Sequence, residues 1–270
     1  MAADFNRRQD VLQRLLLNVY GFVERTGILD VPAVRRAFEA CYSIYKTRLE
    51  ARNISNAKRF VHTGDVVIDV GANIGVLTSL FARWVGHGGR VIAIEPEPVN
   101  LAALRRRVKR RGLLPVVEIV SAAAGDCSGR VRLRITPHHP GDHHLVAGGA
   151  STGDIINVDS VTLDGLLAAR KLCCPSLLKI DVQGAELSVL RGAEQTLMRC
   201  RPVLLIEVDR GALARAGSGE HELSGFLAAL GYAPHELSTG RPLCHVSTLL
   251  PPGRDYVDVL FIPEPTARAP

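Results

Sequence analysis

Residues 67–75 read Val-Ile-Asp-Val-Gly-Ala-Asn-Ile-Gly, and this stretch decides the fold. A short apolar run leads into Gly71 and Gly75, and a helical pattern begins at about residue 75. Glycine lets a backbone turn sharply and approach a ligand closely, so the stretch is typical of a ligand-holding turn between a strand and a helix. The Gly-x-Asn-x-Gly spacing differs from the dinucleotide fingerprint Gly-x-Gly-x-x-Gly.

Short apolar runs alternate with helical stretches on the C-terminal side of this turn. Strands are predicted at Val66–Val70, Arg90–Ile94, Val116–Val120, Leu177–Asp181, Val203–Val208 and Val257–Ile262. Helices are predicted near residues 75–85, 97–111, 185–199 and 220–230. Continuous apolar strands separated by helices indicate a parallel sheet that is covered on both faces. We therefore predict an α/β fold with a doubly wound, Rossmann-like, mostly parallel sheet.

Two regions depart from this alternation and set the predicted domain organisation. Residues 1–60 have apolar positions at helical spacing and no strand signal, so they are predicted to be a helical extension or lid on a main domain at 61–265. Residues 130–135 and 154–161 are predicted to form a β-hairpin with a long loop between its strands. Long loops are commonly functional, so we expect the insertion at 124–160 to lie over an acceptor site.

Composition restricts the class of protein. Hydrophobic residues make up 47% and charged residues 22%, which allows a full core and argues against disorder. No apolar run reaches the eighteen or so residues that would span a bilayer, so we expect a cytoplasmic protein. The six cysteines form no Cys-x-x-Cys pair, which argues against a zinc site or a disulfide framework and predicts buried free thiols.

Much of the net charge of +6 lies in residues 105–111, Arg-Arg-Arg-Val-Lys-Arg-Arg. A basic stripe of this kind is the usual footprint of contact with a nucleic acid or an acidic membrane. It is more often typical of a solvated helix end, where cations complement the helix dipole before Gly112. We favour the helix end and expect no nucleic-acid partner.

The polar residues at the strand ends suggest a nucleoside ligand that also carries a cation. An acid at Asp69 suits an amino-acid ammonium better than a pyrophosphate, and Asn73 offers both a donor and an acceptor at the turn. Glu95 ends the second strand, twenty residues after Gly75. A carboxylate there can accept hydrogen bonds from both hydroxyls of a ribose, although it can also be an acidic cap of the next helix.

The sequence resembles the class I methyltransferases, and most closely the FkbM family, over about residues 64–230. The matching segments, in the family's order, are 67–75, 91–98 (Val-Ile-Ala-Ile-Glu-Pro-Glu-Pro), 120–126 (Val-Ser-Ala-Ala-Ala-Gly-Asp), 162–164 (Thr-Leu-Asp), 178–186 (Leu-Lys-Ile-Asp-Val-Gln-Gly-Ala-Glu), 190–194 (Leu-Arg-Gly-Ala-Glu) and 204–208 (Leu-Leu-Ile-Glu-Val). One departure is Gln183, where the family usually has Glu.

The resemblance implies a last strand that is antiparallel, S-adenosyl-L-methionine as cofactor, and methyl transfer to a hydroxyl of a sugar, a glycolipid or a hydroxylated natural product. It assigns the methionine portion of the cofactor to Asp69, Gly71, Asn73 and Gly75, and the ribose to Glu95. Asp126 would contact the adenine amino group, or it would be a turn residue before Gly129.

Two groups are candidates for the general base. Asp181 follows the fourth main strand, where it can be a base or a helix cap, and Glu186 can bind substrate or support the first turn of that helix. His143 and His144 in the loop 137–144 can also accept a proton near neutral pH. A metal site that includes Asp142 lacks helical ligand spacing, so we expect no metal.

Three other functions remain open at this stage. A nicotinamide-dependent oxidoreductase shares the fold class but lacks its fingerprint here. A nucleic-acid methyltransferase fits the sequence pI of about 9.2, but residues 181–184 read Asp-Val-Gln-Gly instead of Asn/Asp-Pro-Pro-Tyr. A non-catalytic binding protein would need a degenerate cleft. We expect a small-molecule or glycosyl acceptor, with peripheral membrane contact through Val11–Val23 if the acceptor is a glycolipid.

Overall fold

A computed structural model describes residues 54–135, 143–145, 154–250 and 255–265 of the chain. Most of the helical extension predicted at 1–60 therefore lies outside the described residues, and the domain boundary near residue 60 stays a prediction. Its described end contains one short helix, α3 (Ser55–Lys58), and Ile54 and Ala57 are buried against the main domain.

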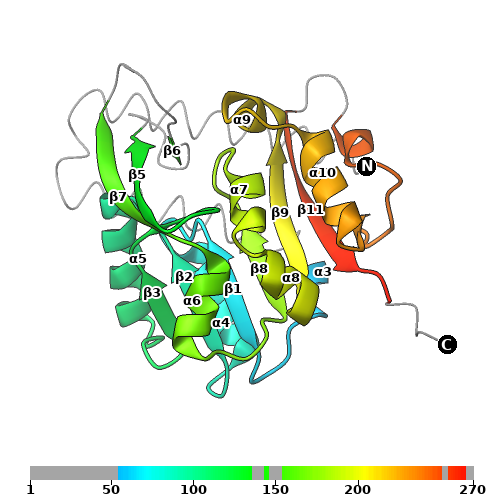
Figure 1. Cartoon of the computed structure of the whole chain (residues 1–270). Helices are drawn as coiled ribbons and strands as arrows, with labels where there is room; N and C mark the ends of the chain where they lie inside the picture. Colours follow the sequence, from blue (N-terminus) through cyan, green and yellow to red (C-terminus); the bar gives the residue numbers. More distant parts are fainter. Residues whose placement is uncertain (1–53, 136–142, 146–153, 251–254, 266–270) are drawn as a thin grey trace, which may run out of the picture.

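The main sheet has seven strands within the described residues, in the order β10-β11-β9-β8-β1-β2-β3 (Figure 1). Their bounds are β1 Val66–Val70, β2 Arg90–Ile94, β3 Val117–Val120, β8 Leu177–Ile180, β9 Val203–Asp209, β10 Tyr232–Glu236 and β11 Tyr256–Pro263. Neighbours from β9 to β3 pair in parallel, and β11 is antiparallel to both β9 and β10. The predicted fold class is confirmed, including the antiparallel last strand.

The strands are continuous apolar runs because helices cover both faces of the sheet. Successive residues point to opposite faces, so Ile68, Ile92 and Ile180 lie in one apolar core while Val67, Val91 and Leu177 lie in the other. The helices on the first face are α6 Leu163–Arg170, α7 Glu186–Arg191, α8 Glu194–Cys200, α9 Arg210–Arg215 and α10 Glu220–Ala229. The second face is covered by α3, α4 Val76–Val85 and α5 Pro98–Arg110. A 3₁₀ turn at Val246–Leu249 precedes β11.

A second, four-stranded sheet of the described residues carries the insertion, in the order β4-β7-β5-β6. Its strands are β4 Ala123–Ala124, β5 Gly129–Arg134, β6 His144–Leu145 and β7 Ile155–Val161. β5 and β7 are antiparallel, which confirms the predicted hairpin. Leu133 and Val158 are buried on one face of this sheet, as the alternation in β5 and β7 requires.

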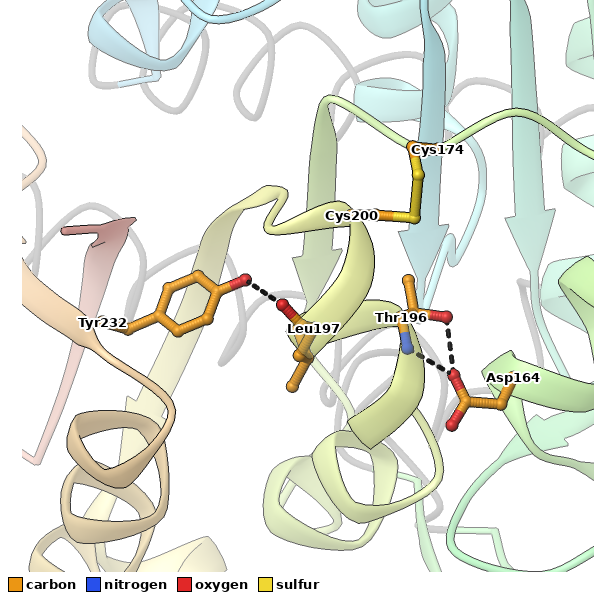
Figure 2. Close-up of a disulfide and its surroundings, with 6 residues drawn as sticks. All are labelled: Asp164, Cys174, Thr196, Leu197, Cys200 and Tyr232. Carbon is orange, nitrogen blue, oxygen red and sulfur yellow. Dashed lines mark hydrogen bonds between the residues drawn. A yellow bond between two sulfur atoms is a disulfide. The ribbon is translucent and has the colours of Figure 1, made fainter. Parts of the chain in front are cut away.

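The helix predicted at 185–199 is two helices, α7 and α8. The break lies at Gly192, where a Cβ would be 1.9 Å from the carbonyl oxygen of Gly125, so the backbones approach too closely for any side chain. The new helix start at α8 is capped from outside. The Asp164 carboxylate accepts from the backbone N–H of Thr196 at 2.9 Å (Figure 2). It also accepts from the backbone N–H of Gln195 at 3.0 Å.

The cysteine prediction was wrong for the described cysteines. Cys174 and Cys200 form a disulfide (Figure 2) with a Cα–Cα distance of 5.1 Å. Cys127, Cys173 and Cys244 are exposed free thiols. The spacing of the cysteines along the chain does not reveal this pair, because it is the sheet that brings the two residues together. Cys174 and Cys200 precede β8 and β9, which are parallel neighbours, so the two segments enter the sheet side by side.

The basic segment 105–111 ends α5, and its residues do not share one environment. Arg107 is buried, and its Nε donates to the carbonyl oxygen of Ile74 at 2.8 Å, whereas Arg105, Lys109 and Arg110 are exposed. Part of the charge run therefore supports the glycine turn. Among the helices of the described ranges, none is long and apolar enough to cross a membrane.

Candidate cofactor and acceptor site

The predicted site residues converge at the carboxyl ends of β1, β2 and β8. Val70 pairs with Ile94 on one side and with Ile180 on the other, so the next residues of all three strands meet at the same edge. Open α/β sheets bind ligands at this edge, next to the point where the strand order reverses. Here the reversal lies between β1 and β8.

The glycine turn is fixed by its neighbours on both sides. The backbone N–H groups of Gly71 and Ala72 both donate to the carbonyl oxygen of Ile94 at 3.0 Å. Gly71 has φ +73°, and a Cβ on it would lie 1.9 Å from the carbonyl oxygen of Asp181. A Cβ on Gly75, which has φ +81°, would lie 2.4 Å from the Leu104 side chain. The turn therefore requires glycine at both positions.

Glu95 is tied to this turn. Its Oε2 accepts from the backbone N–H of Asn73 at 2.8 Å, and its Oε1 accepts from the backbone N–H of Glu97 at 2.9 Å. The side chain is buried, and this desolvation raises the pKa of Glu95 to about 7 despite the two amide donors. The helix-capping role that the sequence left open for Glu95 is filled by Glu97 instead. The Glu97 carboxylate accepts from the N–H groups of Val99 and Asn100 at the start of α5.

Asn73 has φ 51°, a left-handed conformation that asparagine tolerates better than most residues. Its side-chain Oδ1 accepts from the backbone N–H of Ile74 at 2.7 Å. The residue predicted to offer polar groups at the turn therefore also holds the turn in shape.

Asp69 lies beneath the turn, with none of its surface exposed. Its Oδ2 accepts from Thr78 Oγ1 at 2.6 Å, and its Oδ1 lies 3.5 Å from Lys179 Nζ without a hydrogen-bond partner. The predicted contact between Asp69 and a ligand ammonium stays a prediction, because the carboxylate faces α4 and β8 in this structure.

The sequence alone indicated no role for Lys179, although this residue interrupts the apolar run of β8. Its Nζ donates to the carbonyl oxygens of Val70 and Gly71 at 3.1 and 2.8 Å. It also lies 3.4 Å from Asp181 Oδ2. A lysine inside a central parallel strand is the signal that marks it in the sequence, since charged residues are almost never fully buried unless they are paired.

Asp181 belongs to a polar group at the ends of β8 and β9. Gln183 has φ 54°, and its Nε2 donates to Asp181 Oδ1 at 3.2 Å and to Glu207 Oε2 at 2.9 Å. The amide of Gln183 thus bridges two carboxylates. Gln183 is the position at which the sequence departs from the family that it resembles, and the sequence alone assigns no role to Glu207.

Glu186 supports the turn into α7. Its carboxylate accepts from the backbone N–H groups of Val182 and Gly184 at 3.0–3.1 Å. Burial raises the pKa of Glu186 to about 7. These contacts hold the loop that leads into α7, and the alternative in which Glu186 binds substrate stays a prediction.

Asp126 and the two histidines lie on the insertion. Asp126 is exposed in the bend between β4 and β5, and its backbone N–H donates to Ser188 Oγ at 3.1 Å. This placement fits the turn alternative, and the adenine contact stays a prediction. His144 pairs with Arg134 in the second sheet, and His143 precedes it. Their proposed role as base stays a prediction too.

Asp142 and most of the loop 137–144 lie outside the described residues, so the metal hypothesis that included Asp142 lies there as well. Within the ranges that the structure does describe, no group of three or more His, Cys, Asp or Glu residues could hold a metal ion.

The model of the methyltransferase FkbM domain matches residues 69–234. The chain is 34% identical over 157 residues to the 31-O-demethyl-FK506 methyltransferase FkbM of Streptomyces tacrolimicus, covering 48% of this chain and 60% of that protein. It is 28% identical over 149 residues to the hexuronic acid methyltransferase AglP of Haloferax volcanii, covering 54% and 57%.

Among solved structures, the methyltransferase FkbM of Methylobacillus flagellatus aligns with a TM-score of 0.47 and 22% identity, over 73% of this chain and 43% of that one. The chain thus spans less than two thirds of these relatives' length. The match to the FkbM domain, however, covers more than half of the chain and includes Asp69, Glu95 and Asp181. The chain belongs to the FkbM methyltransferase family.

Proposed function

We propose that the chain is an S-adenosylmethionine-dependent O-methyltransferase that acts on a hydroxyl of a sugar, a glycolipid or a hydroxylated natural product. The observation that carries the proposal is the link between Glu95 and the glycine turn. Two backbone amides fix the Glu95 carboxylate at the end of β2, beside a turn that has no side chain at Gly71. A nucleoside fits this arrangement. Its ribose hydroxyls can bind the Glu95 carboxylate, and the turn at Gly71 lets the backbone approach the ligand closely.

The acceptor capacity of Glu95 fits a ribose. A carboxylate has about four acceptor positions, and one backbone N–H occupies each oxygen of Glu95. One position on each oxygen therefore remains for the two ribose hydroxyls. Since the side chain is only 5% exposed, water competes little with them.

The methionine portion fits the turn at residues 71–75. The backbone of Gly71 and Gly75 would lie against it, since neither position tolerates a Cβ. Asp69 would act from beneath, because its carboxylate holds Thr78 at the start of α4 and pairs with Lys179. Asn73 would contact this portion from the tip of the turn.

S-adenosylmethionine supplies a methyl group on a sulfonium, and this chain would supply alignment and proton removal. Alignment of two reactants can lower a barrier by about 7–11 kcal/mol in ideal cases. A general base contributes about 10²–10⁴-fold. Asp181 is our first choice, because its carbonyl borders Gly71 and its side chain is 24% exposed at the same edge. His143 and His144 are the second choice, on the insertion sheet.

An oxygen acceptor is supported by the relatives. One is named for 31-O-demethyl-FK506 and another for hexuronic acid. We propose that the insertion at 124–160 covers the acceptor. Contact of Val11–Val23 with a membrane stays a prediction for a glycolipid acceptor, and this segment lies outside the described residues.

The test is methyl transfer from S-adenosylmethionine that carries a radiolabelled methyl group. The acceptors are neutral sugars, uronic acids, glycolipids and hydroxylated natural products, with an RNA and a protein fraction for comparison. Label in a hydroxylated acceptor, lost in Asp181→Asn, is the expected result. Label only in RNA or protein would contradict the proposed acceptor class. Thermal protection by NAD but not by S-adenosylmethionine would contradict the cofactor.

A further inference from the structure

Lys179 connects two parts of the site that are far apart in the sequence. It lies in β8 opposite Asp69 of β1, and its side chain is 6% exposed. Its ammonium group reaches along β1 to the carbonyl oxygens of Val70 and Gly71. The second of these carbonyls belongs to the glycine turn itself, so the ammonium lies under the proposed cofactor.

The same ammonium lies within ion-pair distance of two carboxylates, Asp69 Oδ1 at 3.5 Å and Asp181 Oδ2 at 3.4 Å. Asp69 is fully buried, while Asp181 is partly exposed toward the edge where the acceptor would bind. Lys179 is therefore in contact with the base of the cofactor turn on one side and with the candidate base on the other.

A buried ammonium is costly, and stability alone gives little reason for it. Replacement of a buried ion pair by apolar residues of similar volume is often neutral or stabilising. Leucine and isoleucine fill the other positions of β8, and all of them are buried. What an apolar residue cannot do is donate to the carbonyl of Gly71 and hold Asp181 at the same time.

We propose that Lys179 is a positioning residue that fixes the carbonyl of Gly71 in the cofactor turn and orients the Asp181 carboxylate beside it. This inference rests on the proposed function. Lys179 acts through the residues that it holds and touches neither reactant. It makes the shape of the cofactor turn and the orientation of the candidate base depend on one side chain.

Burial is the largest influence on the pKa of Glu95 and raises it, and the charge of Lys179, the smallest of the named influences, lowers it. Among the described residues, the charged or titratable groups around this point include Asp69 in β1, Glu95 and Glu97 after β2, Asp181 after β8, Glu186 in α7 and Glu207 in β9. All of these are acids. Removal of the ammonium therefore favours protonation of Glu95, and a ribose contact that needs ionised Glu95 should require a higher pH.

The experiment is calorimetric titration of the full chain with S-adenosylhomocysteine across pH 6–9, on wild type and Lys179→Met. We expect affinity at pH 7 to fall at least tenfold, and the pH at which affinity reaches half its maximum to rise. Affinity within twofold of wild type, or an unchanged pH profile, would overturn the inference. Failure of wild type to bind would instead overturn the proposed function, and the inference with it.

A second pair of variants separates positioning from stability. Lys179→Met leaves Asp69 buried without its counter-ion, so Lys179→Met/Asp69→Asn should unfold at a higher temperature than Lys179→Met. Compared with Asp69→Asn alone, the double variant should still bind S-adenosylhomocysteine at least tenfold more weakly. Equal affinity of these two variants would show that Lys179 only compensates the charge of Asp69, and it would overturn the inference. This pair also decides the matter if Lys179→Met does not fold.

Discussion

Asn73 donates its backbone N–H to Glu95 Oε2 over 2.8 Å, which joins the tip of the glycine turn to the end of the next strand. The two residues are 22 positions apart, and each holds the other in place for a ligand. The Glu95 carboxylate is buried, so we expect ligand binding to depend on whether it is protonated.

The first prediction concerns the pH dependence of cofactor binding. Burial raises the pKa of Glu95 to about 7, and an ionised carboxylate is needed to accept from two ribose hydroxyls. Affinity for S-adenosylhomocysteine should therefore rise about tenfold between pH 6 and pH 8, following the ionised fraction. Calorimetry at constant ionic strength measures this, and Glu95→Gln should lose most of the dependence. A flat wild-type profile would contradict it.

The second prediction concerns stability. The pKa values of Glu95 and Glu186 are both raised from 4.5 to about 7, so the folded state holds protons that the unfolded state releases. Their contribution is most favourable below about pH 4.5 and is lost as pH rises to about 7, on the order of 2–3 kcal/mol per carboxyl. Urea unfolding at pH 5 and pH 7.5 checks this.

Glu186→Gln is the matched variant for that experiment, because it removes one of the two titrations while glutamine keeps a carbonyl acceptor for the loop at 182–184. The difference in unfolding free energy between the two pH values should shrink in the variant. An undiminished difference would show that other groups cause the pH dependence.

The third prediction concerns Gly71. Alanine there would place a Cβ 1.9 Å from the carbonyl oxygen of Asp181 at φ +73°, so the turn must move. We expect Gly71→Ala to lose cofactor binding and at least about 2 kcal/mol of stability. Gly112→Ala is the control, since Gly112 has φ +65° with nothing within 4 Å of a Cβ. It should cost about 1 kcal/mol and leave binding intact; equal effects would contradict the steric explanation.

The fourth prediction concerns the disulfide in Figure 2. Cys174 and Cys200 are 26 residues apart, and a loop of that size predicts about 3–4 kcal/mol of stabilisation by restriction of the unfolded chain. Cys200→Ser should lower the unfolding free energy by about this amount, and a reducing agent should destabilise wild type but not the variant. Cys173→Ser is the control, because Cys173 is an exposed free thiol. Insensitivity of wild type to reduction would count against the disulfide.

Much of the main sheet could be read from the sequence because its strands are buried on both faces. β1 and β2 have the predicted bounds, Val66–Val70 and Arg90–Ile94. β10 was missed because Tyr232–Glu236 contains Pro234 and His235 and is not an apolar run. Its position at the sheet edge explains how a proline is tolerated there.

The site was predictable where its residues follow strands, and not where contacts cross the sheet. Gly71, Glu95 and Asp181 could be placed at one edge from strand order alone. The contact of Lys179 with Asp69 could not, because it requires β1 and β8 to be neighbours although they are more than a hundred residues apart. The disulfide between Cys174 and Cys200 was hidden because it requires β8 and β9 to be neighbours in the sheet.

The most direct test of the central claim is calorimetric titration of S-adenosylhomocysteine into wild type and Glu95→Ala at pH 8, with the exposed Glu222→Ala as control. We predict micromolar binding to wild type and to Glu222→Ala, and at least a hundredfold loss in Glu95→Ala, because two charge-assisted hydrogen bonds to the ribose disappear. Undiminished binding to a folded Glu95→Ala would contradict the assignment of the ribose. No binding to wild type would contradict the cofactor itself.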